Sequence, residues 1–156
     1  MTARDEFIAK AKAEATQARA LGSPIVVGAV VAQAALESCY GQSHLATQAN
    51  NLFGIKATKR WHGPTLAMGT EEYEDGELKK VRDVLWRVYP SWRDCFTNYG
   101  EIIAHTVWFR DCVEASRVND ARKFIHGLVN NGEPRWATDP DYEDKVWKIV
   151  QQHRLA

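Results

Sequence analysis

The spacing of apolar residues in the first quarter of the chain predicts two helices of different kinds. Residues 4–20 place their apolar side chains on one face only, which is typical of an amphipathic helix. Residues 24–37 are apolar nearly all round, which predicts a helix buried among other elements. Ser23-Pro24 supplies the expected cap and first turn of this second helix.

The pattern changes to that of a β-hairpin further along the chain. Residues 65–73 and 78–89 have the composition and spacing of strands. Asp75-Gly76 between them is a strong signal for a tight two-residue turn. Helical spacing then returns, and we expect helices over about 91–107 and 120–129. Asp139-Pro140 is expected to open a last helix.

Helices, one hairpin and helices again predict an α+β fold that is mostly helical with a small β-hairpin lobe. The chain has 156 residues, of which 45 % are hydrophobic and 26 % charged, as in an ordinary globular protein. We therefore expect one domain over residues 1–156, with the β lobe over about 61–89.

Charge and cysteine content exclude several classes of protein. Twenty Lys and Arg residues balance twenty Asp and Glu residues, whereas a dedicated nucleic-acid binder normally has a basic excess. The three cysteines form neither a disulfide framework nor a zinc motif, and the longest uncharged run, residues 20–36, is too short to span a membrane. The charged start of the chain is unlike a secretory signal, so synthesis in a bacterial cytoplasm is expected. We predict no metal, no cofactor, no membrane insertion and a monomer.

Glu37 is the first candidate for chemistry. It is the first charged residue after the long uncharged run and stands at the C-terminal end of the predicted buried helix. Apolar surroundings and the negative end of the helix dipole both raise the pKa of a carboxyl group, and a carboxyl that keeps its proton near neutral pH suits a general acid. The alternative is that Glu37 marks only the point where the helix reaches solvent.

The segments after Glu37 have the composition of a sugar-binding site. Residues 38–43 form a small polar loop, and residues 50–56 combine amide side chains with an aromatic ring and a glycine. Asn51 and Phe53 are therefore candidates for contacts with saccharide hydroxyls and C–H faces. The alternative for residues 52–55 is a buried turn that leads into the β lobe.

Several of these segments together resemble the glucosaminidase family of peptidoglycan hydrolases, glycoside hydrolase family 73. The matching segments, in chain order, are Ala32–Ser38 (AQAALES), Gly41–Ser43 (GQS), Asn51–Lys56 (NLFGIK), Thr70–Gly76 (TEEYEDG), Val88–Trp92 (VYPSW) with Asn98–Tyr99 (NY), and Ala137–Tyr142 (ATDPDY). Each is weak alone, but their common order over nearly the whole chain is specific.

The resemblance implies an endo-β-N-acetylglucosaminidase on a lysozyme-like fold, cleaving the GlcNAc-β-1,4-MurNAc bond of peptidoglycan. The family's catalytic glutamate falls on Glu37. Its less securely assigned second carboxylate, matched through Thr-x-Glu-Tyr, falls on Glu72 rather than Glu71, since only one of two neighbouring strand residues faces the cleft. The alternative is a solvated acidic strand edge. Inverting, retaining and substrate-assisted mechanisms remain open.

The chain departs from the family pattern at Trp136, where tyrosine is common before Ala-Thr-Asp-Pro. Tryptophan keeps a stacking face and an N–H donor but has no hydroxyl. We expect saccharide contacts from Asn51, Phe53, Tyr73 and Trp136. Trp61 is a further cleft candidate, whereas Trp147 has the spacing of a core residue.

Other functions are compatible with parts of the sequence. A cysteine peptidase would pair Cys39 with a histidine, but a thiolate is favoured at a helix N-terminus rather than just after a C-terminus. A zinc amidase lacks clustered histidines. A lytic transglycosylase or a muramidase on the same fold, and a non-catalytic glycan-binding or morphogenetic protein, remain alternatives. The absent signal and wall-binding repeats favour a phage or prophage endolysin that acts on the wall after release from the cytoplasm.

Overall fold

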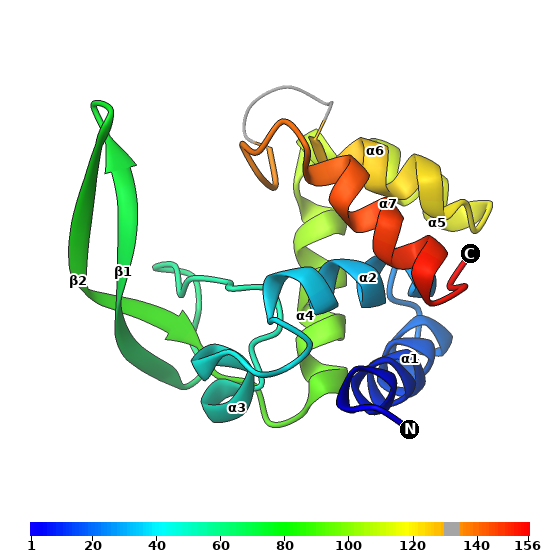
Figure 1. The fold of residues 1–156 in the computed structure, drawn as a ribbon, viewed down its shortest axis with the longest axis horizontal. Coiled ribbons are helices and arrows are strands. Elements are labelled where there is room, and N and C mark those ends of the chain that lie inside the picture. The colour runs from blue at the N-terminus through cyan, green and yellow to red at the C-terminus, as the bar shows by residue number, and fades with distance from the viewer. Residues whose placement is uncertain (130–134) are drawn as a thin grey trace.

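Helices form the body of the molecule, and a long hairpin extends from one side of it (Figure 1). The computed structural model describes residues 1–129 and 135–156, and at Tyr73 the backbone alone. The helices are α1 (Ala3–Ala20), α2 (Val27–Glu37), α3 (His44–Ala49), α4 (Trp92–His105), the 3-10 helix η1 (Val107–Phe109), α5 (Arg110–Arg117), α6 (Ala121–Val129) and α7 (Tyr142–Gln152); the strands are β1 (Thr65–Glu74) and β2 (Glu77–Arg87).

Helix α2 occupies the centre of the helical body and packs against α1, α6 and α7. All its residues from Gly28 to Ala35 are buried, as the apolar pattern predicts. The predicted start was wrong, because the helix begins at Val27 behind Val26, which makes no side-chain cap. Residues 23–26 instead run as an irregular segment into the core.

The hairpin confirms the predicted turn and strands. Asp75 and Gly76 both have positive φ, 52° and 79°, as a type I′ turn requires. The antiparallel register runs from the pair Glu74 and Glu77 at the tip to Thr65 and Arg87 at the base, with one bulge in which Asp83 has a φ of 61°. At the base, a single bridge between Lys56 and Trp86 joins the hairpin to the preceding loop.

The other predicted helices occur within a few residues of their expected ranges. Ser91 caps α4 by accepting a hydrogen bond from the Asp94 N–H at 3.1 Å, and α7 begins shortly after Asp139-Pro140. The helices α3, η1 and α5 were not predicted, because they are short. The asparagine-glycine stop expected after α6 falls on residues 130–132, outside the described part. None of the helices described is long and apolar enough to cross a membrane.

Candidate active site

A cleft of about 1720 Å³ lies between the helical body and the hairpin. Its walls come from the end of α2, the loop 53–61, both strands, α4 and the segment from 135 into α7. Charged groups of both signs line it: Glu37, Lys56, Arg60, Glu72, Arg87, Glu101, His105, Arg135, Asp139 and Lys145. The cleft therefore brings together two of the carboxylates that the sequence singled out, Glu37 and Glu72.

Glu37 is the last residue of α2, and its carboxyl group opens onto the cleft. Tyr142 on α7 donates its hydroxyl hydrogen to Oε1 of Glu37 at 2.7 Å, and the Trp136 indole N–H lies near enough to the carboxyl to favour its charged form. Although the residue is exposed through the cleft, protein crowds the carboxyl on its other sides. This loss of hydration raises the pKa of Glu37, and the Tyr142 hydroxyl and the Trp136 indole N–H offset only part of the rise.

A tight turn directly after Glu37 carries the chain away from the cleft. Cys39, Tyr40 and Gly41 all have positive φ. The buried Ser38 side chain holds the turn, donating to the Ala34 carbonyl at 2.6 Å and accepting from the Gly41 N–H at 2.8 Å. The turn leaves the Glu37 side chain at an abrupt helix end, open to the cleft.

Glu72 lies on strand β1 and forms an ion pair with Lys56 across the cleft entrance. Along this strand Leu66, Met68, Thr70 and Glu72 are half-buried, whereas the alternate residues 67, 69 and 71 are exposed, so Glu72 belongs to the covered face. Glu71 points to the opposite face and does not line the cleft. This placement is the one that the motif match favoured, while the catalytic role of Glu72 stays a prediction.

Asn51 does not occupy the position expected of a saccharide contact. Its side chain is buried, and its amide N–H groups donate to the carbonyls of Ile55 and Arg87, each at 2.9 Å. Its carbonyl oxygen accepts from the Ile55 N–H at 3.0 Å. The amide therefore ties the loop 51–55 to the base of the hairpin, and this internal bonding leaves no group free for a ligand.

The aromatic candidates divide between floor and wall of the cleft. Phe53 is buried but lines the cleft from beneath, 4.4 Å between ring centroids from Tyr99. Trp136 is half-buried and lies 6.1 Å from Phe53, so it offers both a ring and, through its N–H, a contact with Glu37. Trp61 also lines the cleft, but Arg87 covers one face of its ring at 4.9 Å. The side chain of Tyr73 lies outside the described part.

Sequence reasoning missed two residues beside Glu37. Tyr142 entered only as the last residue of the matched segment Ala137–Tyr142 and Gln33 only within the segment Ala32–Ser38, and neither was given a role at the site. The available signal was that Gln33 and Glu37 are the only polar side chains between Val27 and Glu37.

Among the described residues, neither the cysteine thiols nor the side chains that commonly bind metals form an alternative catalytic site. Cys39 is exposed and does not line the cleft, and burial raises the pKa of Cys95 and of Cys112 to about 12. A thiol that holds its proton so firmly is a poor nucleophile. Within residues 1–129 and 135–156, no group of three His, Cys, Asp or Glu side chains is placed to hold a metal ion.

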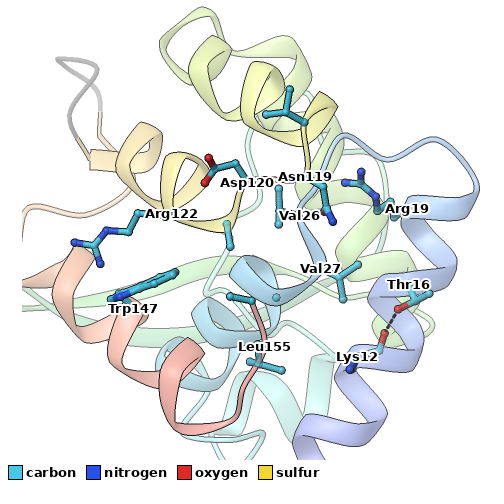
Figure 2. A pocket seen from close by; sticks show the side chains of 14 residues that line it. Lys12, Thr16, Arg19, Val26, Val27, Asn119, Asp120, Arg122, Trp147 and Leu155 are labelled. Carbon is cyan, nitrogen blue, oxygen red and sulfur yellow. Dashed lines mark hydrogen bonds between the residues drawn. The ribbon is translucent and has the colours of Figure 1, made fainter.

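A second pocket, of about 490 Å³, lies at the opposite end of α2 from Glu37 (Figure 2). Three of its charged side chains, those of Arg19, Asp120 and Arg122, have partners inside the protein. Arg19 donates to the carbonyl of Ser116 at 3.0 Å, and Asp120 caps α6 by accepting from a backbone N–H. Arg122 lies 4.9 Å over the ring of Trp147, which is half-buried and packs against the edge of the core. These contacts join α1 to α5 and α6 to α7 near the start of α2.

Comparison with known proteins identifies the family. A family model described as mannosyl-glycoprotein endo-beta-N-acetylglucosaminidase matches residues 13–155. The peptidoglycan hydrolase FlgJ of Salmonella typhimurium is 35 % identical over 127 residues, which cover 79 % of this chain and 38 % of FlgJ. The exo-glucosaminidase LytG of Bacillus subtilis is 35 % identical over 130 residues, covering 80 % of this chain and 43 % of LytG. The chain thus spans less than half the length of these relatives.

The fold agrees with the same assignment. The C-terminally truncated glycoside hydrolase domain of Salmonella typhimurium FlgJ superposes with a TM-score of 0.76 and 32 % identity, covering 99 % of each chain. This similarity confirms the predicted lysozyme-like α+β architecture, and the family match confirms the resemblance seen in the motifs. The chain belongs to the glucosaminidase family of glycoside hydrolases.

Proposed function

We propose that this protein hydrolyses the glycan strands of peptidoglycan, cutting the β-1,4 bond between GlcNAc and MurNAc so that GlcNAc becomes the new reducing end. One observation carries the proposal: the carboxyl group of Glu37, whose pKa is raised by burial, stands in the wall of the cleft and accepts a hydrogen bond from Tyr142 at 2.7 Å. A glycoside hydrolase needs such a proton donor beside an extended saccharide groove.

Glu37 acts as the general acid in this proposal. Its proton passes to O4 of MurNAc as the bond from that oxygen to C1 of GlcNAc breaks. The resulting carboxylate is stabilised by the hydrogen bond from Tyr142, which strengthens as negative charge develops on the acceptor, and by the nearby indole N–H of Trp136. The same two donors thus hold the acid in place before the reaction and favour its ionised product afterwards.

Glu72 acts as the general base, taking a proton from the water that attacks C1 of GlcNAc from the opposite side and inverting its configuration. Its support is placement, since Glu72 lies on the covered face of β1 and lines the cleft that contains Glu37. The ion pair with Lys56 keeps the carboxylate at the cleft in the free protein. A carboxyl separation of about 6.5–9.5 Å in a substrate complex would agree with inversion, and about 5–5.5 Å with a retaining nucleophile.

The test is a digest of purified peptidoglycan, reduced with borohydride and read by mass spectrometry, with wild type beside Glu37→Gln. Reduced GlcNAc ends that disappear in the variant are the expected result. Reduced MurNAc ends would instead identify a muramidase, and anhydro-MurNAc ends a lytic transglycosylase. An absence of new ends from the wild-type digest would favour a non-catalytic glycan-binding protein.

We further propose that the protein serves as a phage or prophage endolysin that is made in the host cytoplasm and reaches the wall only after release. Its support is the sequence-based expectation described above together with the proposed activity. Expression in bacterial cytoplasm should leave cells intact until chloroform permeabilises the inner membrane, and rapid lysis should follow. Lysis without permeabilisation, or no lysis after it, would contradict this role.

A further inference from the structure

Asn98 lies in the wall of the cleft, and the mechanism above does not use it. It stands on α4 within hydrogen-bond distance of Arg87, the last residue of β2, and both side chains line the cleft. The hairpin extends from the helical body, and its strands pair mainly with each other (Figure 1). The contacts that join the hairpin to the body therefore determine where Glu72 stands.

The side-chain amide of Asn98 makes three hydrogen bonds, and the direction of each is fixed by its partner. Its Oδ1 accepts from Nη1 of Arg87 at 2.9 Å and from the hydroxyl group of the buried Tyr89 at 2.6 Å. Its Nδ2 donates to Oε2 of Glu101 at 3.2 Å. Since a guanidinium group can only donate and an ionised carboxylate can only accept, the amide has one orientation. Asn98 thus holds the Arg87 side chain on α4.

Arg87 extends this contact to the base of the hairpin and the loop beside it. Its Nε donates to the carbonyl of Lys56 at 3.1 Å, and its backbone N–H donates to the carbonyl of Ile55, also at 3.1 Å. The side chain of Lys56 in turn forms the ion pair with Glu72. An unbroken series of contacts therefore leads from Asn98 on α4 to Glu72 on β1.

We propose that Asn98 is a positioning residue for the general base: it fixes the base of the hairpin on α4 and so sets how far Glu72 stands from Glu37. This inference rests on the proposed role of Glu72. Without the amide oxygen, the Arg87 side chain is released from α4, and the base of the hairpin can shift against the helical body. Glu72 lies on the tip side of the hairpin's bulge, so a shift at the base displaces it. A displaced base lowers the rate of the chemical step more than the affinity for the glycan.

The test compares two substitutions of Asn98 in kinetics on soluble glycan strands. Asn98→Leu keeps the volume but accepts no hydrogen bond, so kcat should fall on the order of tenfold while KM stays within about twofold. Asn98→Asp loses the donor to Glu101 but still accepts from Arg87, so its kcat should stay within about threefold of wild type. Thr97→Val, at the neighbouring position on α4 and outside the cleft, is the matched control and should leave both values unchanged.

A double-mutant cycle shows whether Asn98 acts through Glu72. Glu72→Gln removes the proposed base, so the addition of Asn98→Leu should lower kcat by less than about twofold further. A saccharide contact made by Asn98 itself would instead raise KM and cost the same factor in both backgrounds, which would overturn the proposal. Arg87→Lys keeps the charge but not the fork of donors, so it repeats the test even if Asn98→Leu does not fold. An unchanged kcat in both Asn98→Leu and Arg87→Lys would also overturn the proposal.

The contact itself can be measured without activity. The side-chain Nε–H resonance of Arg87, assigned by its loss in Arg87→Lys, should exchange slowly with water in wild type and faster in Asn98→Leu. Unchanged exchange would mean that the guanidinium group is held without the amide, which contradicts the proposal. An inactive wild-type protein, or full activity in Glu72→Gln, would overturn the proposed function on which the inference rests, and this resonance would still test the contact.

Discussion

The two carboxylates of the cleft are carried by parts of the molecule that are built in different ways. Glu37 ends a helix that packs against α1, α6 and α7, and Tyr142, which donates a hydrogen bond to its carboxyl group, belongs to the same helical body. Glu72 lies on a hairpin whose two strands pair mainly with each other and whose side chains are largely exposed, and its ion-pair partner is a single lysine. Glu37 is therefore fixed by the core, whereas Glu72 is positioned by the hairpin, which extends from the helical body as an arm.

This difference suits the two roles that we propose. A general acid must keep its proton until the substrate arrives, which requires crowded surroundings and donors in fixed positions. A general base must reach a water molecule on the far side of the sugar, and a two-stranded arm can approach from that side after the glycan strand has entered. The comparison leads to five predictions, in order of decreasing effect.

Glu37→Gln should abolish most of the activity, lowering kcat by about 10²- to 10⁴-fold, because the amide cannot supply the proton. Its oxygen can still accept hydrogen bonds from Tyr142 and Trp136, so the fold should be retained. Kinetics on soluble glycan strands and a thermal melt measure both effects. The matched control is Glu114→Gln, an exposed carboxylate on α5, which should leave both values unchanged. Substantial activity in Glu37→Gln would remove Glu37 from its proposed role.

Glu72→Gln should lower kcat by about 10²-fold, whereas Glu71→Gln should lower it by less than about twofold. The two residues are neighbours on the same strand with the same charge, and only their faces differ. The two substitutions remove the same charge from the same strand, so a difference between them reports which face of the strand the side chain occupies. Equal effects of the two substitutions would indicate that the arm contributes charge rather than a specific base.

Glycine-to-alanine substitutions should affect the body more than the arm. At Gly28 an added Cβ would lie 2.0 Å from the carbonyl oxygen of Leu155, and at Gly76 it would meet nothing within 4 Å. We expect Gly28→Ala to lower the free energy of unfolding by about 1–3 kcal/mol through overpacking. Gly76→Ala should cost about 1 kcal/mol through its positive φ alone. Urea unfolding measures both, and a larger loss at Gly76 would contradict the comparison.

The raised pKa of Glu37 should also make stability depend on pH. Between the ordinary value of 4.5 and the higher folded value, the folded protein binds a proton that the unfolded chain has lost. Stability from this group is therefore complete below pH 4.5 and is lost as the pH rises through the folded pKa. Glu37→Gln does not titrate, so its melting temperature should exceed that of wild type at neutral pH, with the difference closing toward pH 4. A difference that is constant with pH would show that the carboxyl is not perturbed.

The smallest effect is expected from the ion pair on the arm. The side chains of Lys56 and Glu72 are 50 % and 43 % exposed, so Lys56→Met should change the free energy of unfolding by less than about 1 kcal/mol. It should lower kcat by a few fold, because Glu72 loses the contact that keeps it at the cleft. A rise in kcat would instead mean that the ion pair restrains Glu72 from its role.

Local signals predicted most of the fold because each strong one is satisfied within a few residues. The Asp75-Gly76 turn needs only two residues with positive φ, and the Ser91 cap needs only the first turn of its own helix. The prediction was wrong at Ser23-Pro24, where residues 23–26 enter the core as irregular chain instead of starting α2. These residues pack against α4 instead, where the side chain of Ser23 occupies the space beside Gly100. The helices α3, η1 and α5 were not predicted, because they are too short to show a repeating apolar pattern.

At the site, the sequence by itself was sufficient to single out Glu37, because a lone charge at the end of an apolar helix is visible in one segment. It was also sufficient, through the order of weak motifs, to indicate the family. Only the tertiary structure decided that Asn51 turns inward and that Tyr142 and Trp136 meet the Glu37 carboxyl, whereas for Glu72 and Glu71 it agrees with the choice that the motif had favoured. The physical reason is that a hydrogen bond between residues 105 positions apart depends on how whole helices pack, which no local pattern of side chains encodes.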